Sequence, residues 1–272
     1  MASGLGRRVV SAPLELVADA ALGVVDATEV VSCSDDRGAV VLWHHLLNCG
    51  LRVAAVAGTD AFLSFAHGPG VASNPPGWGR VYARLGEEPL TAAAFAEAVR
   101  AGRTVVTNGP WLTLEVDGAG PGAALERRPG DRLDVRAAVR GSGVDRLVLY
   151  GPDGELAATT TGDELRHVVT ADRGTWLAAA AHGGDDPHTL GAPVFAHTSP
   201  VYVDVAGRRV ARASSARWCL RALDALEALV TAEGRFDPAR RLEQLGDLVA
   251  VVDRARAFYR GVAGEAGRYV DG

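Results

Sequence analysis

The sequence predicts an α/β segment, then an antiparallel β-sandwich, then two helices. Three observations predict this order. Over residues 1–110, β-branched runs alternate with segments of helical spacing, which is typical of crossover units on a parallel sheet. Over 111–212, short strands of alternating polarity are separated by turn signals such as Asp117-Gly118, which favours a sandwich. Over 213–272, two amphipathic segments flank a break at 234–237, which predicts a helical pair.

The first segment is expected to form a parallel sheet. A helix over 13–22 ends at Gly23, and the β-branched run 27–31 predicts a strand. A second helix over 40–47 ends at Gly50, a residue typical of helix C-termini. The expected later elements are a strand at 52–57 that delivers Asp60 at its end, a Gly- and Pro-rich loop at 67–79, a strand near Val81, a helix at 91–101 and a strand at 104–107.

The remaining elements follow the same two periodicities. Alternation of apolar and polar residues predicts antiparallel strands in the sandwich, and helical spacing predicts the last two helices. The expected strands are 112–116, 133–137, 146–150, 175–179 and 201–205, and the expected helices are 218–230 and 238–259.

Composition excludes several classes of function. The 272 residues carry 28 basic and 33 acidic side chains, so the net charge of -5 argues against a nucleic-acid partner. Every basic residue other than histidine is arginine, which excludes a Schiff-base lysine, a pyridoxal-phosphate enzyme and a Walker-type phosphate loop. No uncharged run is long enough for a signal peptide or a membrane span, so we expect a cytoplasmic protein with no membrane partner.

Motifs for most enzyme classes are absent from the sequence. It contains no His-x-His, no His-Glu-x-x-His, no Gly-x-Ser-x-Gly and no Gly-x-Gly-x-x-Gly after a strand. The strongest remaining candidate is Asp60, because α/β folds collect functional groups at the carboxyl ends of their strands. A carboxylate at that edge suits a divalent cation, and a turn-capping role is the equally weighted alternative.

Four stretches of this sequence resemble the CehA/McbA family of metallohydrolases, a branch of the polymerase and histidinol phosphatase (PHP) superfamily. The stretches are Leu46–Gly50 with Ala57–Asp60, Gly77–Tyr82, Arg100–Pro110 and Ala196–Tyr202. The resemblance implies the C-terminal part of a distorted seven-stranded β/α barrel, followed by a β-sandwich. It also implies a small-molecule substrate and bound divalent metal ions, zinc or manganese, that activate water to attack an ester, carbamate or phosphoester.

The resemblance also implies roles for individual residues. Asp60 matches the aspartate of the last PHP metal motif, whereas Phe62 stands where many members have a metal-binding histidine. His67 is a possible substitute ligand, with a surface role as the alternative. Glu29 is a further candidate metal ligand, against a buried or turn-capping role. Arg80 resembles the family's loop arginine. This arginine either orients an anionic substrate or fixes the loop through an ion pair with a carboxylate. No other cofactor site is expected.

Two hypotheses of function follow from the sequence. The family's early His-x-His and its middle Glu and His have no counterpart here, so we expect a truncated barrel with an incomplete metal site that is inactive alone. Three explanations stay open: Met1 is an internal start, the gene is a truncated remnant, or, less favoured, a partner chain completes the barrel. The other hypothesis is a non-catalytic remnant whose sandwich binds carbohydrate or protein. Exposed aromatic side chains would favour it. The candidates are Trp111, Trp176 and Tyr202, although the alternation of their strands favours burial of these side chains.

Overall fold

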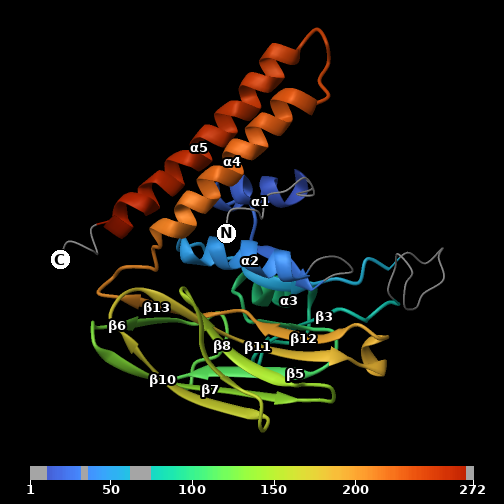
Figure 1. The fold of residues 1–272 in the computed structure, drawn as a ribbon, viewed down its shortest axis with the longest axis vertical. Coiled ribbons are helices and arrows are strands. Elements are labelled where there is room, and N and C mark those ends of the chain that lie inside the picture. Colours follow the sequence, from blue (N-terminus) through green and yellow to red (C-terminus); the bar gives the residue numbers. More distant parts are fainter. Residues whose placement is uncertain (1–10, 32–35, 62–74, 268–272) are drawn as a thin grey trace. The chain divides into compact units, whose positions relative to one another are not determined.

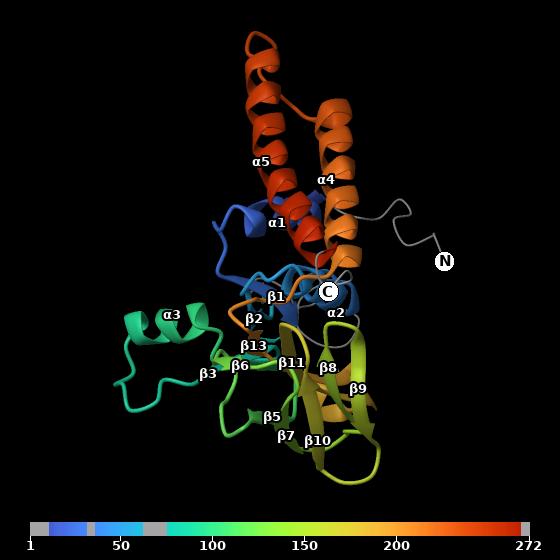
Figure 2. The ribbon, with the colours of Figure 1, turned by 90° about the vertical axis from the view of Figure 1, so that its left-hand side faces the viewer.

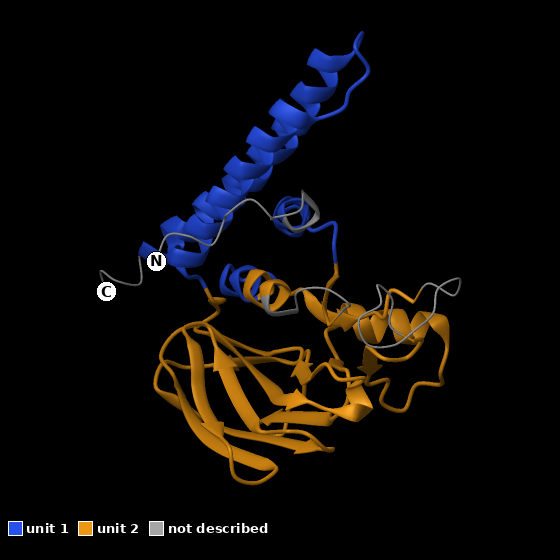
Figure 3. Ribbon diagram, turned by 45° about the vertical axis from the view of Figure 1, so that its right-hand side comes forward, with its two compact units in different colours: residues 1–25, 44–51, 211–272 blue, residues 26–43, 52–210 orange. Residues whose placement is uncertain are grey.

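The chain is a mixed α and β protein that divides into two compact units. The computed structural model describes residues 11–31, 36–61 and 75–267, and within them it has five α-helices and thirteen strands (Figure 1). The helical unit comprises residues 1–25, 44–51 and 211–272, and the strand unit comprises residues 26–43 and 52–210 (Figure 3). No helix in the described ranges is long and apolar enough to cross a bilayer.

Most of the strand unit is a sandwich of largely antiparallel strands, as the alternating polarity predicts. One sheet has the order β10-β7-β5, and the other has the order β3-β4-β12-β11-β13-β6, with β8 and β9 joined to it through β11 (Figures 1 and 2). The strand bounds are β5 Trp111–Val116, β6 Ala124–Arg127, β7 Asp131–Arg140, β8 Arg146–Gly151, β9 Gly154–Thr159, β10 Glu164–Ala171, β11 Thr175–Asp185, β12 Pro193–Thr198 and β13 Val201–Val205.

The sandwich core is built by every second residue of its strands. In β5 and along most of β7 exposed and buried positions alternate, because successive side chains of a strand point to opposite faces of the sheet. Facing residues of β8 and β11 close the other side of the core. The core includes Leu112, Leu114, Leu133, Val135, Leu147, Leu149, Leu177 and Ala179.

The predicted parallel sheet is only two strands wide. β1 (Ala27–Val31) and β2 (Ala54–Ala57) are parallel, with α2 (Asp36–Asn48) between them in the chain. The prediction that the strands near Val81 and at 104–107 extend this sheet is wrong. β3 (Arg80–Ala83) and β4 (Thr104–Thr107) pair antiparallel to each other, and β4 pairs with β12 on its other side. Both edges of β4 are therefore occupied, and no closed barrel forms within the described ranges.

Two buried hydroxyl groups join β2 to this larger sheet. Ala55 donates its N–H to Ser199 Oγ (2.8 Å), and its carbonyl oxygen accepts from Thr104 Oγ1 (2.7 Å). The two hydroxyl oxygens are themselves 2.7 Å apart. Side chains thus satisfy a backbone amide and carbonyl that would otherwise be buried without partners at the edge of a two-stranded sheet.

The helical unit contains α1 (Ser11–Ala21), the last turn of α2, α4 (Ala213–Glu233) and α5 (Arg241–Gly267). Tyr259 of α5 donates its hydroxyl to the carbonyl oxygen of Val17 in α1 (2.8 Å). The long helices α4 and α5 confirm the predicted helical pair; α4 extends beyond the predicted 218–230 at both ends, and α5 begins three residues later than predicted and ends eight residues later. Cys49 and Cys219 are buried free thiols, and Cys33 lies outside the described residues.

We predict that Ser199→Ala lowers the free energy of unfolding by about 1–3 kcal/mol, because it leaves the buried Ala55 amide without an acceptor. Urea unfolding of the purified protein measures this change. Thr170→Val, at an exposed position of β10, is the control and should stay within about 0.5 kcal/mol of the unsubstituted protein. Equal stability of the two variants would contradict the role assigned to Ser199.

Candidate functional site

The carboxyl ends of β1 and β2 lie side by side, as the parallel pairing requires. Glu29 pairs with Val56 and Val31 with Ala57, and Gly58 donates its N–H to the carbonyl oxygen of Val31 (3.1 Å). The chain then leaves β2 through Thr59 and Asp60. Of the residues predicted to bind metal, Asp60 therefore follows this edge, and Glu29 lies two residues before it on β1.

Glu29 lies against the backbone of Gly58. It sits within β1 rather than at its end, and the register shifts between Glu29 and Val31. A β-carbon on Gly58 would collide with Oε1 of Glu29, so only glycine leaves room for the carboxylate there. A β-carbon on Gly79 would in turn lie 2.7 Å from the Gly58 carbonyl oxygen, which shows how closely the loop before β3 approaches this edge.

Asp60 has a left-handed backbone. Its φ is +48°, a conformation that few residues other than glycine adopt and that aspartate tolerates better than most. Such backbone conformations cluster at functional sites and in turns. Asp60 is an exposed residue.

Arg80 follows Gly79 as the first residue of β3, where it pairs with Thr107. Its Nε is buried and, within the described ranges, has no hydrogen-bond partner. The preceding loop is anchored by Trp78, whose indole N–H donates to the carbonyl oxygen of Thr189 (3.0 Å) in the β11–β12 connection. The backbone of this loop therefore brings Arg80 close to Gly58, and no ion pair of Arg80 occurs among the residues that the structure describes.

These residues do not complete a metal site. His67 lies outside the described residues, and no group of three or more His, Cys, Asp or Glu side chains that could hold a metal occurs within them. Glu29 and Asp60 offer two oxygen donors, whereas catalytic metals take at least three protein ligands. Carboxylates have the right chemistry for a divalent cation, but two of them are too few.

The histidines of the sandwich form an aromatic cluster in the strand unit. His197 is fully buried, 5.1 Å from the Trp43 ring and 6.0 Å from the Tyr150 ring between centroids, and its Nδ1 is 2.8 Å from the Thr198 carbonyl oxygen. His182 lies beside it, with Nε2 3.5 Å from the Tyr150 hydroxyl. Burial lowers the pKa of His197 to about 4, with His182 a smaller contribution in the same direction. His197 is therefore neutral at pH 7.

Of the three aromatic residues considered as binding platforms, strand alternation buries two, as expected, and Trp111 is exposed. Trp176 and Tyr202 are buried, whereas 44% of Trp111 is accessible. Its ring meets that of Tyr82 edge to face, with centroids 4.8 Å apart, and Tyr82 is 42% exposed. Sequence reasoning missed Tyr82, although the alternation in Arg80–Ala83 places it on the opposite face of the strand from Val81.

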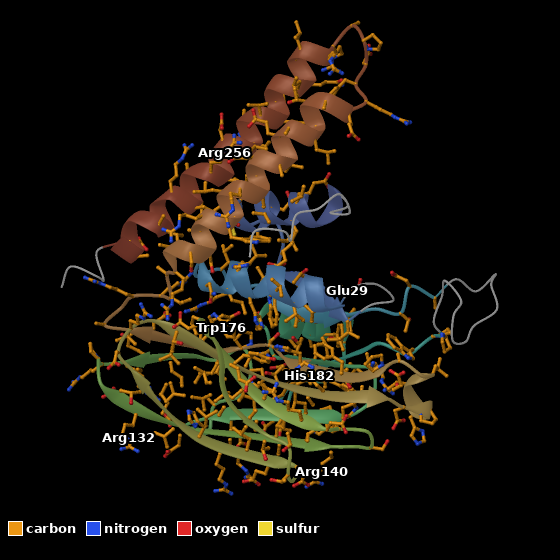
Figure 4. The ribbon with its side chains drawn as sticks, viewed as in Figure 1. Glu29, Arg132, Arg140, Trp176, His182 and Arg256 are labelled. Carbon is orange, nitrogen blue, oxygen red and sulfur yellow. The ribbon has the colours of Figure 1, made fainter. Side chains whose placement is uncertain are left out.

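A polar groove of about 740 Å³ runs along the outer face of β5, β7 and β10. Arg136 and Arg166 both bind Glu164, and Asp117 binds Arg127 (2.7 Å), so charges of both signs alternate along this face. Arg132 and Arg140 of β7 point away from the core on the same side (Figure 4). The groove therefore presents no cluster of a single charge.

Comparisons with known proteins add little to this geometry. No family model matches the sequence, and no curated protein matches it. The sulfur carrier protein SoxY from Chlorobium limicola f thiosulfatophilum is 13% identical, with a TM-score of 0.25 over 35% of this chain and 77% of that one. The fibronectin(III)-like modules of Clostridium thermocellum CbhA are 19% identical, with a TM-score of 0.26 over 34% and 93%. Such TM-scores define neither a fold nor a function for this chain.

We predict that His197 makes stability fall in acid. The unfolded chain protonates this residue below its ordinary pKa of 6.5, whereas the folded chain resists protonation until about pH 4. Its contribution is full above pH 6.5 and is lost as the pH falls to 4, by about 3 kcal/mol. Urea unfolding between pH 7.5 and 4 measures this loss. The unsubstituted protein is compared with His197→Phe at each pH, so that the effects of the carboxylates, which both proteins share, cancel in the difference.

The control for this measurement is His188→Gln, since His188 is exposed. That variant should keep the full pH dependence, whereas His197→Phe should show a shallower one. Parallel pH profiles for His197→Phe and the unsubstituted protein would contradict the prediction.

Proposed function

We propose that this chain is part of a metal-dependent hydrolase similar to the CehA/McbA branch of the PHP superfamily. Glu29 and Asp60 are its candidate ligands for a zinc or manganese ion, and Arg80 is its candidate contact for an anionic substrate. The observation that carries the proposal is the close approach of the Glu29 carboxylate to Gly58, two residues before Asp60, where the chain leaves β2. The substrate class is an ester, carbamate or phosphoester.

Three features support this assignment. The carboxyl edge of parallel strands is where α/β folds place their functional groups. Asp60 adopts a strained backbone, and Gly58 lacks the side chain that would displace the Glu29 carboxylate. Arg80 directly follows Gly79, whose backbone packs against the Gly58 carbonyl oxygen, so the strand that carries this cation begins close to the end of β2. Further metal ligands would come from residues outside the described ranges, His67 among them, or from another chain.

A second candidate function is carbohydrate binding by the strand unit, and the exposed pair Tyr82 and Trp111 favours it. Sugar rings stack on exposed aromatic faces, and two rings that meet edge to face form a corner that presents one face of each. This function requires neither Glu29 nor Asp60, so the two candidates can be tested separately.

The hydrolase proposal predicts that the purified chain contains close to one zinc or manganese ion, measured by elemental mass spectrometry. Asp60→Asn and Glu29→Gln should each reduce the metal content at least tenfold, because each removes a charged oxygen donor. Glu88→Gln, an exposed carboxylate outside the site, should leave it unchanged. Metal-free protein after growth and dialysis with both ions, or equal metal content in all variants, would contradict the proposal.

The carbohydrate proposal predicts that soluble neutral polysaccharides such as β-glucan, xylan or mannan retard the chain in affinity electrophoresis. Trp111→Ala should weaken retardation at least tenfold, because stacking of the sugar ring on the indole face supplies most of the binding energy of this contact. Val168→Ala, at an exposed apolar position of β10, is the matched control. Equal retardation of both variants, or none with any of the three polysaccharides, would contradict sugar binding at this site.

A further inference from the structure

The helical unit contains an apolar pocket of about 250 Å³ between α1, α4 and α5. Its walls include Leu226 and Val230 of α4 and Val252 of α5. Leu226 and Val252 are each 5% exposed, so these parts of the wall belong to the packed interior. Leu248, also part of the wall, is 42% exposed and marks an opening to solvent.

All ionisable side chains that line the pocket are acidic. They are Glu15 and Asp19 of α1 and Glu227 of α4. Glu227 already has a counter-charge, because its carboxylate is 2.6 Å from Nη1 of Arg256. Arg256, which lies on α5 (Figure 4), also binds Asp224 and Asp253.

Glu15 and Asp19 are not paired with Arg256 as Glu227 is. They are four residues apart on α1, so they lie on one face of the helix, where two like charges destabilise it slightly. Neither carboxylate forms an ion pair within the described part of the chain. A cation placed between them would relieve their repulsion while its attached chain entered the apolar space.

We propose that this pocket binds a small amphipathic cation, an organic ammonium ion with a hydrocarbon body. The hydrocarbon would lie against Leu226, Val230 and Val252, and the ammonium group would lie between Glu15 and Asp19. An apolar cavity of about 150 Å³ holds benzene, so this pocket suits a body of roughly eight carbons. A carboxylate of the same length is disfavoured by the two acidic groups. The pocket lies in the helical unit, and its occupancy is independent of the hydrolase proposal.

Isothermal titration calorimetry of the full chain at pH 7 and low salt tests this proposal with three probes of equal length: n-octylammonium, n-octanol and octanoate. Octylammonium should bind, octanol should bind at least tenfold more weakly, and octanoate should not bind. Equal affinity for octanol or octanoate would overturn the charge recognition. Absence of octylammonium binding would overturn the site and identify the space as a packing defect.

Variants locate the binding. Glu15→Gln combined with Asp19→Asn should weaken octylammonium binding at least tenfold and leave octanol binding unchanged. Asp247→Asn, on α5 but outside the pocket lining, is the matched control and should bind like the unsubstituted protein. Leu248→Trp at the mouth should weaken both ligands by obstructing entry. Helix content from circular dichroism shows that each variant is folded. Unchanged binding in the charge variant or in Leu248→Trp would overturn the assignment.

Discussion

The backbone N–H and carbonyl oxygen of Ala55 join the parallel pair of strands to the sandwich within the strand unit. Its N–H and carbonyl oxygen are bound by Ser199 and Thr104, and the backbone of Ser199 donates to that of Thr104 (2.9 Å). All three residues are buried, so water cannot replace these bonds. Asp60 follows β2 by three residues and Glu29 lies on the neighbouring strand. The geometry of the candidate site therefore depends on two hydroxyl groups that take no part in its chemistry.

The stretches that resemble the metallohydrolase family contain several residues whose hydrogen bonds join one strand or loop to another. The Asn108 side chain accepts from Phe195 N–H and donates to the Pro193 carbonyl oxygen, which joins the end of β4 to β12. Trp78 binds the β11–β12 connection, and Thr198 Oγ1 accepts from Ala179 N–H (3.0 Å). These polar residues join segments that lie far apart in the sequence. The candidate site residues Asp60 and Arg80 lie in the same stretches, and Glu29 lies outside them.

Local patterns in the sequence predicted where helices and strands occur better than they predicted which strands pair with each other. The alternation in Leu112–Val116 predicted β5 and its buried face, and the glycine at position 50 marked the end of α2. Strand-helix-strand order around 81–107 suggested another parallel crossover, yet β3 and β4 pair directly, because β4 finds its second partner in β12, about ninety residues later. The contact between Glu29 and Gly58 could not be predicted either, since it depends on how β1 and β2 pair. Tyr82 could be placed on an outer face, but its contact with Trp111 requires the β3–β4 pairing.

The distance in sequence between Ala55 and Ser199 has a consequence for the order in which the molecule folds. The two residues are 144 positions apart, so the hydrogen bonds around Ala55 cannot form on the ribosome until most of the sandwich has emerged. Until then, β2 has one edge without backbone partners, exposed to other strands and to chaperones. Slow synthesis through β5 to β12 would prolong that exposure, whereas the helical hairpin of α4 and α5, with its local contacts, can form as soon as it is made.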